Sequence, residues 1–455
     1  MTSKVLPGGE IAVLGLAKSG SAVARLLLRN HHKVYASDGG SSPALAETAA
    51  ALRALGARVD VGAHDLARIA RASTVVVSPG IDPLATPIAA ARSARRPLVS
   101  EVEIALRFMP GSRVIAVTGT NGKTTTTALI GHLLRGIGNS AVDAGNIGTP
   151  LSEVAMLDSQ PEWIALEMSS FQLHDTPGLK PTVGVLTNLT PDHLDRYPSA
   201  NEYYADKARL FANATPESRW VCNADDRRVV DMAMGVDGSQ FRFSTAGRAD
   251  AWLEDESTLC VFGERLISRA ELNLLGDHNV ANALAAALAV SVADDAHRGA
   301  EARAAIANSL RTFNALAHRL EVVGEFEGVQ WINDSKATNV SSTLVAVLGM
   351  RRPTILLLGG RHKGEPYTRL ADAVRASVKT VIAYGEAANS IESDLRDMVN
   401  VERMGSDFDA VMERARALAR PGDAVLLSPA CSSFDMFRNY EERGTRFRQL
   451  AGSVA

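Results

Sequence analysis

A glycine loop beside a lysine and a threonine is the sequence feature whose chemistry is clearest. The apolar run Val114–Thr118 leads into Gly119-Thr-Asn-Gly-Lys-Thr-Thr125, in the order of a strand, a phosphate loop and a helix start. The two glycines let backbone N–H groups turn toward phosphates, while Lys123 can reach the β- and γ-phosphates and Thr124 can ligate Mg²⁺. The strict pattern asks for glycine where Val117 stands. The remaining residues favour an ATP site over a threonine-rich helix cap.

Two candidate metal ligands follow this loop, each just beyond a further apolar run. Glu167 ends Trp163-Ile-Ala-Leu-Glu167, and His193 lies in the segment 188–195. Carboxylate is a usual ligand of Mg²⁺, and imidazole is a less usual one. Taken singly, Glu167 is more simply a surface carboxylate and His193 a loop histidine bonded to backbone. Their shared position, after strands of a sheet that carries a phosphate loop, favours a functional role.

The N-terminal region carries a weaker glycine signal. Gly15-Leu-Ala-Lys-Ser-Gly20 follows a predicted strand and Asp38 ends the next one, in the register of a dinucleotide-binding fingerprint. Ala17 stands where a second glycine would admit a pyrophosphate, so hydride transfer with NAD is the weaker interpretation. The alternatives are a helix N-terminus that holds a phosphate or uridine group, and a tight turn that binds nothing.

Strands and helices alternate from one end of the chain to the other. Short apolar runs predict buried parallel strands, which indicates an α/β fold with mainly parallel sheets. Segment 241–274 is less regular, and we expect a small antiparallel excursion there. The predicted strands are Ile11–Leu16, Lys33–Asp38, Thr74–Ser78, Val114–Thr118, Ile164–Met168, Val183–Thr187, Ile355–Leu358, Val381–Tyr384 and Ala424–Ser428.

The length of 455 residues exceeds what one hydrophobic core holds, so two to three domains are expected. Pro110-Gly111 separates the first α/β block from a new strand, and Phe313–Arg319 precedes another. We therefore predict three domains, at 1–111, 112–315 and 316–455.

Composition restricts the class of protein. Hydrophobic residues make up 46% and charged residues 22%, which is ordinary for a soluble globular chain. A net charge of -3 provides no broad basic surface for nucleic acid or an anionic membrane. The three cysteines lie far apart, as suits a reducing cytosol. The N-terminus lacks the apolar core of a signal peptide and the apolar stretch 281–293 is too short to span a bilayer, so we expect a cytoplasmic protein.

Together, these motifs resemble the Mur ligases of peptidoglycan synthesis, a family that includes folylpolyglutamate synthetase. The resemblance rests on the phosphate loop, on Glu167-Met-Ser-Ser170 and on Asn188-Leu-Thr-Pro-Asp-His-Leu-Asp195, and it covers essentially the whole chain. Motifs of the last domain are similar to those of the D-glutamate-adding branch, and the Asp-Asn-Pro-Arg motif of the diaminopimelate-adding branch is missing. These motifs are Asn333-Asp-Ser-Lys-Ala-Thr-Asn339, Leu358-Gly-Gly360 with Lys363, and Leu427-Ser-Pro-Ala-Cys-Ser-Ser-Phe-Asp435.

The resemblance implies a Rossmann-like N-terminal domain that binds a UDP-substrate, a P-loop ATPase-like central domain and a Rossmann-like C-terminal domain that binds an amino acid. The implied enzyme is an ATP-dependent ligase that joins D-glutamate to UDP-N-acetylmuramoyl-L-alanine through an acyl phosphate, releasing ADP and phosphate. Lys123 and two Mg²⁺ ions would neutralise the charge that develops on the transferred phosphate. A cytoplasmic monomer of cell wall biogenesis, cell shape and cell division is expected, without nucleic acid or membrane partners.

The resemblance also assigns roles to individual residues. The catalytic residues are Lys123, Glu167, His193 and Lys207. The residues expected to bind ATP are Gly119, Thr120, Asn121, Gly122, Lys123, Thr124, Thr125, Asn279, Asn282, Arg319 and Asp334. The residues expected to bind the two substrates are Leu16, Asp38, Asn146, His193, Lys336, Thr338, Lys363, Ser433 and Phe434. The expected metal ligands are Thr124, Glu167, His193 and Lys207.

Two of these assignments have simpler alternatives. Lys207 matches the family lysine that carries a carbamate, whereas its spacing alone indicates an ordinary solvated helix lysine. Nearby cations would lower its pKa and stabilise a carbamate, which could orient the second Mg²⁺. Cations and hydroxyl groups of the last domain suit the two carboxylates of D-glutamate, although Ser433 and Thr338 could merely cap helices.

Other interpretations stay open. Asn282 could be a helix-face amide, and Arg319 could form an interdomain ion pair. Within the family, the alternatives are another Mur ligase or a folylpolyglutamate synthetase-like ligase. Outside it, they are an NAD-dependent oxidoreductase and a non-catalytic protein that binds ATP without amino-acid-dependent phosphate release.

Overall fold

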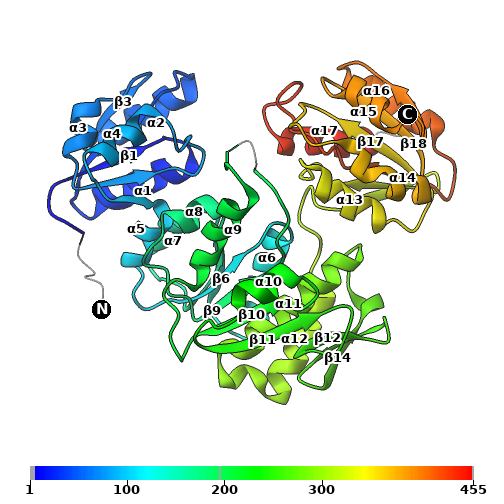
Figure 1. Cartoon of the computed structure of the whole chain (residues 1–455), viewed down its shortest axis with the longest axis horizontal. Helices are drawn as coiled ribbons and strands as arrows, with labels where there is room; N and C mark the ends of the chain where they lie inside the picture. Colours follow the sequence, from blue (N-terminus) through cyan, green and yellow to red (C-terminus); the bar gives the residue numbers. More distant parts are fainter. Residues whose placement is uncertain (1–5, 194–195, 453–455) are drawn as a thin grey trace. The chain divides into compact units, whose positions relative to one another are not determined.

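The computed structural model describes residues 6–193 and 196–452, and helices and strands alternate along these ranges (Figure 1). Leu194 and Asp195, the last two residues of the predicted 188–195 motif, lie outside the described residues.

The chain divides into two compact units. One comprises Met1–Arg269 with Ala281–Leu310, and the other comprises Ala270–Val280 with Arg311–Ala455. The first unit contains two sheets and the second contains one, so the three sheet-containing domains expected from the sequence are present. The domain bounds at 111 and 315 stay predictions.

The first sheet has five parallel strands in the order β3-β2-β1-β4-β5, which is the Rossmann-like order predicted for this region. Successive residues of β1, such as Ala12 and Val13, point to opposite faces. Helices α1, α2 and α5 therefore cover one face and α3 and α4 the other. The elements are β1 Glu10–Leu14, α1 Lys18–Arg29, β2 Lys33–Asp38, α2 Pro43–Ala54, β3 Arg58–Val61, α3 Leu66–Arg71, β4 Thr74–Val77, α4 Thr86–Ser93, β5 Leu98–Ser100 and α5 Glu101–Arg107.

The second sheet has nine strands in the order β14-β13-β12-β11-β10-β9-β6-β8-β7. Strands β6 to β11 pair in parallel, whereas β12, β13 and β14 form the antiparallel excursion predicted at 241–274. The strands are β6 Arg113–Thr118, β7 Ala141–Gly145, β8 Trp163–Glu167, β9 Val183–Leu186, β10 Arg219–Asn223, β11 Ser239–Ser244, β12 Ala251–Glu254, β13 Thr258–Val261 and β14 Glu264–Ser268. The helices are α6 Lys123–Gly136, α7 Leu151–Ala155, α8 Ser170–His174, α9 Ala200–Ala208, α10 Arg227–Ala233, α11 Asp277–Ala293 and α12 Ala300–Thr312.

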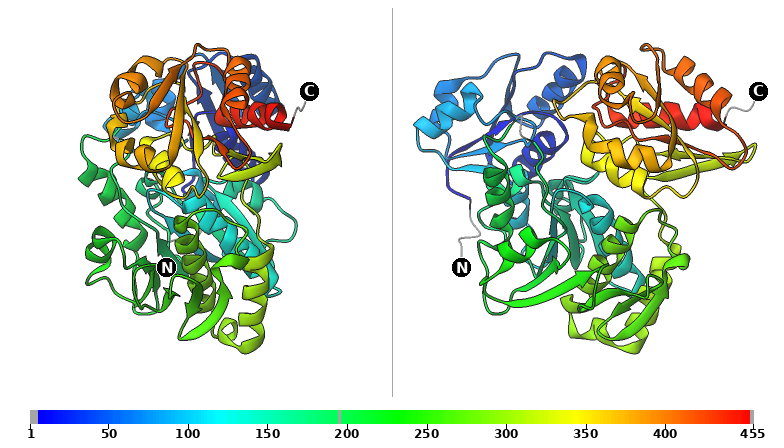
Figure 2. Two further views of the ribbon diagram at one scale, coloured as in Figure 1. Left: turned by 90° about the vertical axis from the view of Figure 1, so that its right-hand side faces the viewer. Right: turned by 45° about the vertical axis from the view of Figure 1, so that its right-hand side comes forward.

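The third sheet, in the second unit, has the order β15-β16-β20-β17-β18-β19, and only β15 runs antiparallel to its neighbour. Helices α13 to α15 pack on one face, and α16 and α17 pack on the other (Figure 2). The strands are β15 Glu321–Phe326, β16 Val329–Asn333, β17 Thr354–Gly359, β18 Val378–Tyr384, β19 Asn400–Arg403 and β20 Ala424–Leu427. The helices are α13 Val340–Leu348, α14 Ala371–Ser377, α15 Ala388–Leu395, α16 Phe408–Leu418 and α17 Tyr440–Gly452.

The nine strands expected from apolar runs are all present. The largest difference is at β18, which begins at Val378 rather than Val381. β1 ends at Leu14, so Leu16 lies in the turn that follows it and not in the strand as predicted. Within the described ranges, no helix is both long and apolar enough to cross a membrane.

Candidate active site

The phosphate loop connects the end of β6 to the start of α6, at the carboxyl edge of the second sheet. Gly119 and Gly122 have φ values of 145° and 79°, which side chains rarely adopt. A Cβ at Gly119 would lie 2.0 Å from Thr187 Oγ1, and one at Gly122 would lie 2.4 Å from Asn282 Oδ1. Both glycines are therefore required for the loop to pack, and α6 directs its N-terminal N–H groups and dipole to the loop.

Thr187 and Asn188, which follow β9, form hydrogen bonds with the phosphate loop. Thr120 N donates to Asn188 O at 2.9 Å, and Asn121 N donates to Asn188 Oδ1 at 2.8 Å. Thr187 Oγ1 donates to Asn121 O at 2.7 Å, and Lys123 Nζ donates to Thr120 O at 2.6 Å. Asn188 thus fixes the shape of the loop by accepting hydrogen bonds from the N–H groups of Thr120 and Asn121. Spacing alone does not reveal this role of Asn188.

Glu167 has the geometry of a cation ligand. Its side chain is buried at the end of β8, where Oε1 accepts a hydrogen bond from Asn146 Nδ2 at 2.7 Å. Its other oxygen, Oε2, is buried and has no hydrogen-bond partner among the described residues. A buried carboxylate oxygen without a donor is costly, and a bound Mg²⁺ would satisfy it. Glu167 and Asn146, predicted as a metal ligand and a substrate contact, are therefore direct neighbours.

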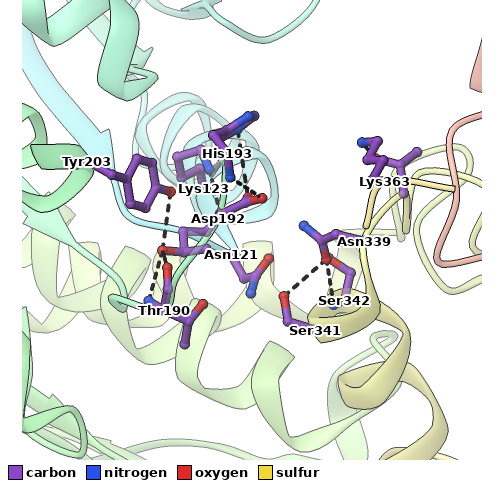
Figure 3. A network of polar contacts seen from close by, with 12 residues as sticks. Asn121, Lys123, Thr190, Asp192, His193, Tyr203, Asn339, Ser341, Ser342 and Lys363 are labelled. Atoms are coloured by element: carbon purple, nitrogen blue, oxygen red, sulfur yellow. Dashed lines mark hydrogen bonds and ion pairs between the residues drawn. The ribbon is translucent and has the colours of Figure 1, made fainter. Parts of the chain in front are cut away.

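His193 lies in a strained and partly exposed loop. Its φ is 55°, and its side chain is 45% exposed, so its ring can be reached by a ligand. The ring lies 5.4 Å from that of Phe171. It lies 6.0 Å from the ring of Tyr203, and Nε2 lies 3.8 Å from Asp192 Oδ2 (Figure 3). The described residues contain no group of three or more His, Cys, Asp or Glu side chains placed to hold a metal. Mg²⁺ usually takes one or two carboxylates together with phosphates and waters.

Lys207 is buried, not solvated as its spacing suggested. Only 1% of the residue is exposed, and Nζ donates to Gly119 O at 2.6 Å. Nζ also lies 4.6 Å from the centre of the Tyr203 ring, whose hydroxyl donates to Thr120 Oγ1 at 3.3 Å. Burial first, and then the charge of Lys123, holds the pKa of the Lys207 amine well below its usual range. α9 thus places a readily deprotonated amine directly beneath the phosphate loop.

The adenine assignments lie on α11. Asn282 Oδ1 accepts a hydrogen bond from Thr126 Oγ1 at 3.2 Å, and the same oxygen limits the space at Gly122. Asn282 is therefore part of the phosphate-loop packing, and it is buried rather than displayed on a helix surface. Asn279 Nδ2 donates to Leu275 O at 2.7 Å, within the second unit.

The first sheet brings Leu16 and Asp38 together. Asp38 Oδ2 accepts from Leu16 N and Oδ1 accepts from Gly40 N, both at 2.8 Å. A Cβ at Gly20 would lie 1.8 Å from Gly15 O, so these glycines serve the tight turn between strand and helix. Lys18, on α1, donates to Gly148 O, which joins this turn to the loop that carries Asn146.

Arg196 is a functional candidate that the sequence did not single out. Its guanidinium lies 4.3 Å from the centre of the Phe171 ring and donates to the carbonyl oxygens of Pro79 and Ile81. It therefore ties the loop after β4 to the segment that carries His193.

In the second unit, cations and hydroxyl groups follow strand ends. Lys363 Nζ lies 3.4 Å from Thr338 Oγ1, and Lys336 Nζ lies 3.8 Å from the centre of the Tyr440 ring. Asn339, not Thr338, caps α13 by accepting from Ser342 N at 2.8 Å (Figure 3).

Ser433 does not cap a helix either, because α17 begins only at Tyr440. Its side chain is buried, whereas the neighbouring Phe434 is 63% exposed. The capping alternative for Ser433 and Thr338 is thus wrong, and both hydroxyl groups lie at the carboxyl edge of the third sheet.

Asp334 is buried at the end of β16. Its carboxyl accepts from Ser428 Oγ at 2.8 Å and from Leu320 N at 3.2 Å. Burial raises the pKa of Asp334 to about 7, although its two hydrogen bonds favour the ionised form.

Three domain descriptions of known families match the chain in order. They are the Mur ligase MurD-like N-terminal domain over residues 9–100, the Mur ligase middle domain over 117–290 and the Mur ligase glutamate ligase domain over 318–431. The chain belongs to the Mur ligase family. Mur ligases form amide bonds at the expense of ATP and use Mg²⁺, so this assignment displaces the oxidoreductase and the non-catalytic alternatives.

Curated relatives extend over the whole chain. The UDP-N-acetylmuramoylalanine–D-glutamate ligase of Anaeromyxobacter dehalogenans is 42% identical, with 100% of both chains covered. The enzyme of the same name from Myxococcus xanthus is 41% identical over 99% of both chains.

Solved structures of Mur ligases share the fold. MurF from Acinetobacter baumannii has a TM-score of 0.64 at 16% identity, covering 96% of this chain and 93% of its own. MurF from Thermotoga maritima in complex with ADP has a TM-score of 0.59 at 16% identity, covering 98% and 96%.

Proposed function

We propose that this Mur ligase joins D-glutamate to the alanyl carboxylate of UDP-N-acetylmuramoyl-L-alanine, with ATP converted to ADP and phosphate. The observation that carries the proposal is the full-length similarity to ligases named for this reaction, at 42% and 41% identity. The phosphate loop beside a buried carboxylate with an unsatisfied oxygen provides the chemistry that such a ligase needs.

The first step moves the γ-phosphoryl group of ATP to the alanyl carboxylate. Both partners are anions, so the site must neutralise charge as they approach. Lys123 and the N-terminus of α6 supply positive potential at the loop. Glu167 Oε2 and the Thr124 hydroxyl would hold Mg²⁺, which when bound adds further positive charge. The amine of D-glutamate then attacks the acyl carbon, and phosphate leaves.

Lys207 is proposed to react with CO₂. Its neutral amine would attack the carbon of CO₂, lose one proton and become an anionic carbamate. Burial and the neighbouring Lys123 favour the neutral amine that this step requires. The resulting carbamate oxygens would be ligands for the second of two Mg²⁺ ions, together with His193.

The amino-acid site is proposed at the carboxyl edge of the third sheet. Lys336 and Lys363 would pair with the carboxylates of D-glutamate, and Thr338, Ser433 and the backbone of Phe434 would donate hydrogen bonds. Arg319 and Asp334 are proposed to contact ATP from the same domain, and Asn279 and Asn282 to contact adenine. Leu16, Asp38 and Asn146 are proposed to hold the UDP-muramoyl substrate, alongside His193.

The biological setting is proposed to be the cytoplasm, where a monomer would supply peptidoglycan precursor for cell shape, growth and division. Size-exclusion chromatography with light scattering tests the monomer. Fractionation of the source cells tests the location, and depletion should cause rounding and lysis.

Phosphate release tests the reaction directly. The purified chain is assayed with ATP, Mg²⁺ and UDP-N-acetylmuramoyl-L-alanine against each D- and L-amino acid. Release that depends on D-glutamate alone supports the proposal. Release that depends on another amino acid would assign the chain to a different Mur ligase branch, and a folate substrate in place of the muramoyl compound tests the folylpolyglutamate synthetase alternative.

A further inference from the structure

Arg443, on α17, is a fully buried cation with an unusual set of partners. It has 0% exposure, and its N–H groups bind one hydroxyl and three backbone carbonyl oxygens. Nε donates to Ser335 Oγ at 2.9 Å, and Nη2 donates to Ser335 O at 2.8 Å. Nη1 and Nη2 each lie 3.2 Å from Cys431 O, and Nη1 lies 3.5 Å from Gly359 O.

Arg443 forms no ion pair within the described part of the chain, although its charge acts at longer range on the buried carboxyl group of Asp334. The two carboxyl groups of the neighbouring motifs are bonded elsewhere: Asp334 to Ser428 and Leu320, and Asp435 to the N–H of Glu386. A buried guanidinium remains charged, because arginine is not deprotonated in proteins. Burial of a charge is unfavourable unless hydrogen bonds replace its hydration, so the buried position of Arg443 requires the bonds that it makes to these loops.

The three segments that Arg443 joins are those that carry the proposed D-glutamate contacts. Ser335 immediately precedes Lys336, and Cys431 lies just before Ser433. Gly359 is the last residue of β17, directly before the loop that leads to Lys363. One planar side chain therefore determines how far apart these three strand-end loops are held.

Glycine at 360 permits this close packing. Its φ is 129°, and a Cβ there would lie 2.3 Å from Ser432 O and 3.2 Å from Arg443 Nη1. The Leu358-Gly-Gly360 motif is thus explained by the loops and the guanidinium that meet at its end.

We propose that Arg443 is a positioning and specificity residue for the acidic amino-acid substrate. Its planar guanidinium holds the three loops at fixed positions, and its buried positive charge favours a dianion at the adjacent site. It acts through these loops, since its burial denies it contact with substrate. The proposal rests on the proposed D-glutamate function of the same site.

Charge and geometry can be separated by substitution. Arg443→Met removes both, whereas Arg443→Lys keeps the charge and loses the planar fork. D-glutamine, in which an amide replaces the side-chain carboxylate of D-glutamate, reports the preference for a dianion. Arg446→Met is the matched control, because Arg446 lies one turn further along α17, pairs with Asp409 and is 41% exposed.

We expect Arg443→Met to raise the KM for D-glutamate about tenfold or more and to reduce the kcat/KM preference for D-glutamate over D-glutamine by a similar factor. Its kcat and its KM for ATP should change less than about threefold. Arg443→Lys should raise the KM for D-glutamate while retaining the preference, and Arg446→Met should resemble the wild type.

Several outcomes would overturn the proposal. One is an unchanged preference in a folded Arg443→Met protein, and another is an equal change of KM for ATP and D-glutamate. Failure of both Arg443 variants to fold, with a folded control, would assign Arg443 to fold stability alone. Absence of D-glutamate-dependent phosphate release in the wild type would instead refute the proposed function, whatever the variants do.

Discussion

Lys207 in the first unit and Arg443 in the second are both fully buried cations, yet their surroundings differ. Lys207 donates one hydrogen bond to a carbonyl oxygen and lies over an aromatic ring, beside the charge of Lys123. Arg443 is bonded through all three of its nitrogen atoms. Burial removes the proton from an amine far more readily than from a guanidinium. The two positions therefore have different uses: Lys207 can become a reactive neutral amine, whereas Arg443 is a permanent charge.

Loss of Lys123, the charged neighbour of Lys207, should have the largest effect on activity. Lys123→Ala removes a positive charge from the phosphate loop, so kcat should fall by roughly 10²–10³-fold. The fold should persist, because Lys123 lies at the start of α6 and its amine donates to Thr120 O of the same loop. Phosphate release and circular dichroism measure the two effects. Near-wild-type turnover by a folded Lys123→Ala protein would remove the loop from the mechanism.

The phosphate loop could be predicted from sequence because its residues are consecutive. Strands such as β6 and β17, which are buried on both faces, contain uninterrupted apolar runs and were found for that reason. Edge strands were missed because polar residues interrupt them, as in Arg58–Val61 and Asn400–Arg403.

The burial of Lys207 and Arg443 could not be predicted, because both lie in polar helical sequence. Tyr203-Tyr-Ala-Asp-Lys207 and Glu441-Glu-Arg443 each read as a solvated helix face. Their burial depends on loops distant in sequence: Gly119 covers Lys207, and Gly359 and Cys431 cover Arg443. The unsatisfied oxygen of Glu167 is likewise visible only in three dimensions.

Loss of Lys207 should have the next largest effect on activity and would test whether its amine is a reactive group. Lys207→Ala should lower kcat by at least about 10²-fold, because the proposed anionic metal ligand disappears. Acetate or formate should restore part of the activity by supplying a carboxylate. Lys207→Arg should not be rescued, since guanidinium retains its charge. Intact mass measured with and without CO₂ provides the direct observation; an active, nucleotide-bound enzyme with unmodified Lys207 would refute the carbamate.

The two cations should also differ in how they link stability to pH. The folded-state pKa of Lys207 is below its unfolded value of 10.5, so between the two values the unfolded chain binds the additional proton. Stability should therefore rise with pH across that window and be lost as pH falls through the folded pKa.

The measurement is Tm against pH for the wild type and for Lys207→Met, without nucleotide and CO₂. The stabilisation by Lys207→Met should be larger at low pH than at high pH. Arg443→Met should show no such trend, because a guanidinium does not titrate in this range. A constant difference between wild type and Lys207→Met would mean that the Lys207 pKa is not lowered in the folded protein.

The smallest effect concerns Ser433, which is buried beside the segment that Arg443 holds. A hydroxyl that donates to a carboxylate contributes roughly 1.5–3 kcal/mol, so Ser433→Ala should raise the KM for D-glutamate about tenfold or more. The KM for ATP should stay within about twofold of the wild type. Ser432→Ala is the matched control, because its hydroxyl donates to Arg361 O at 3.3 Å and serves the loop itself. If both variants raise both KM values equally, Ser433 shapes the loop and does not bind the amino acid. An effect of Ser433→Ala on the KM for D-glutamate alone would place the Ser433 hydroxyl at the substrate. The hydroxyl would then belong to the site whose preference for a dianion we assign to the buried charge of Arg443.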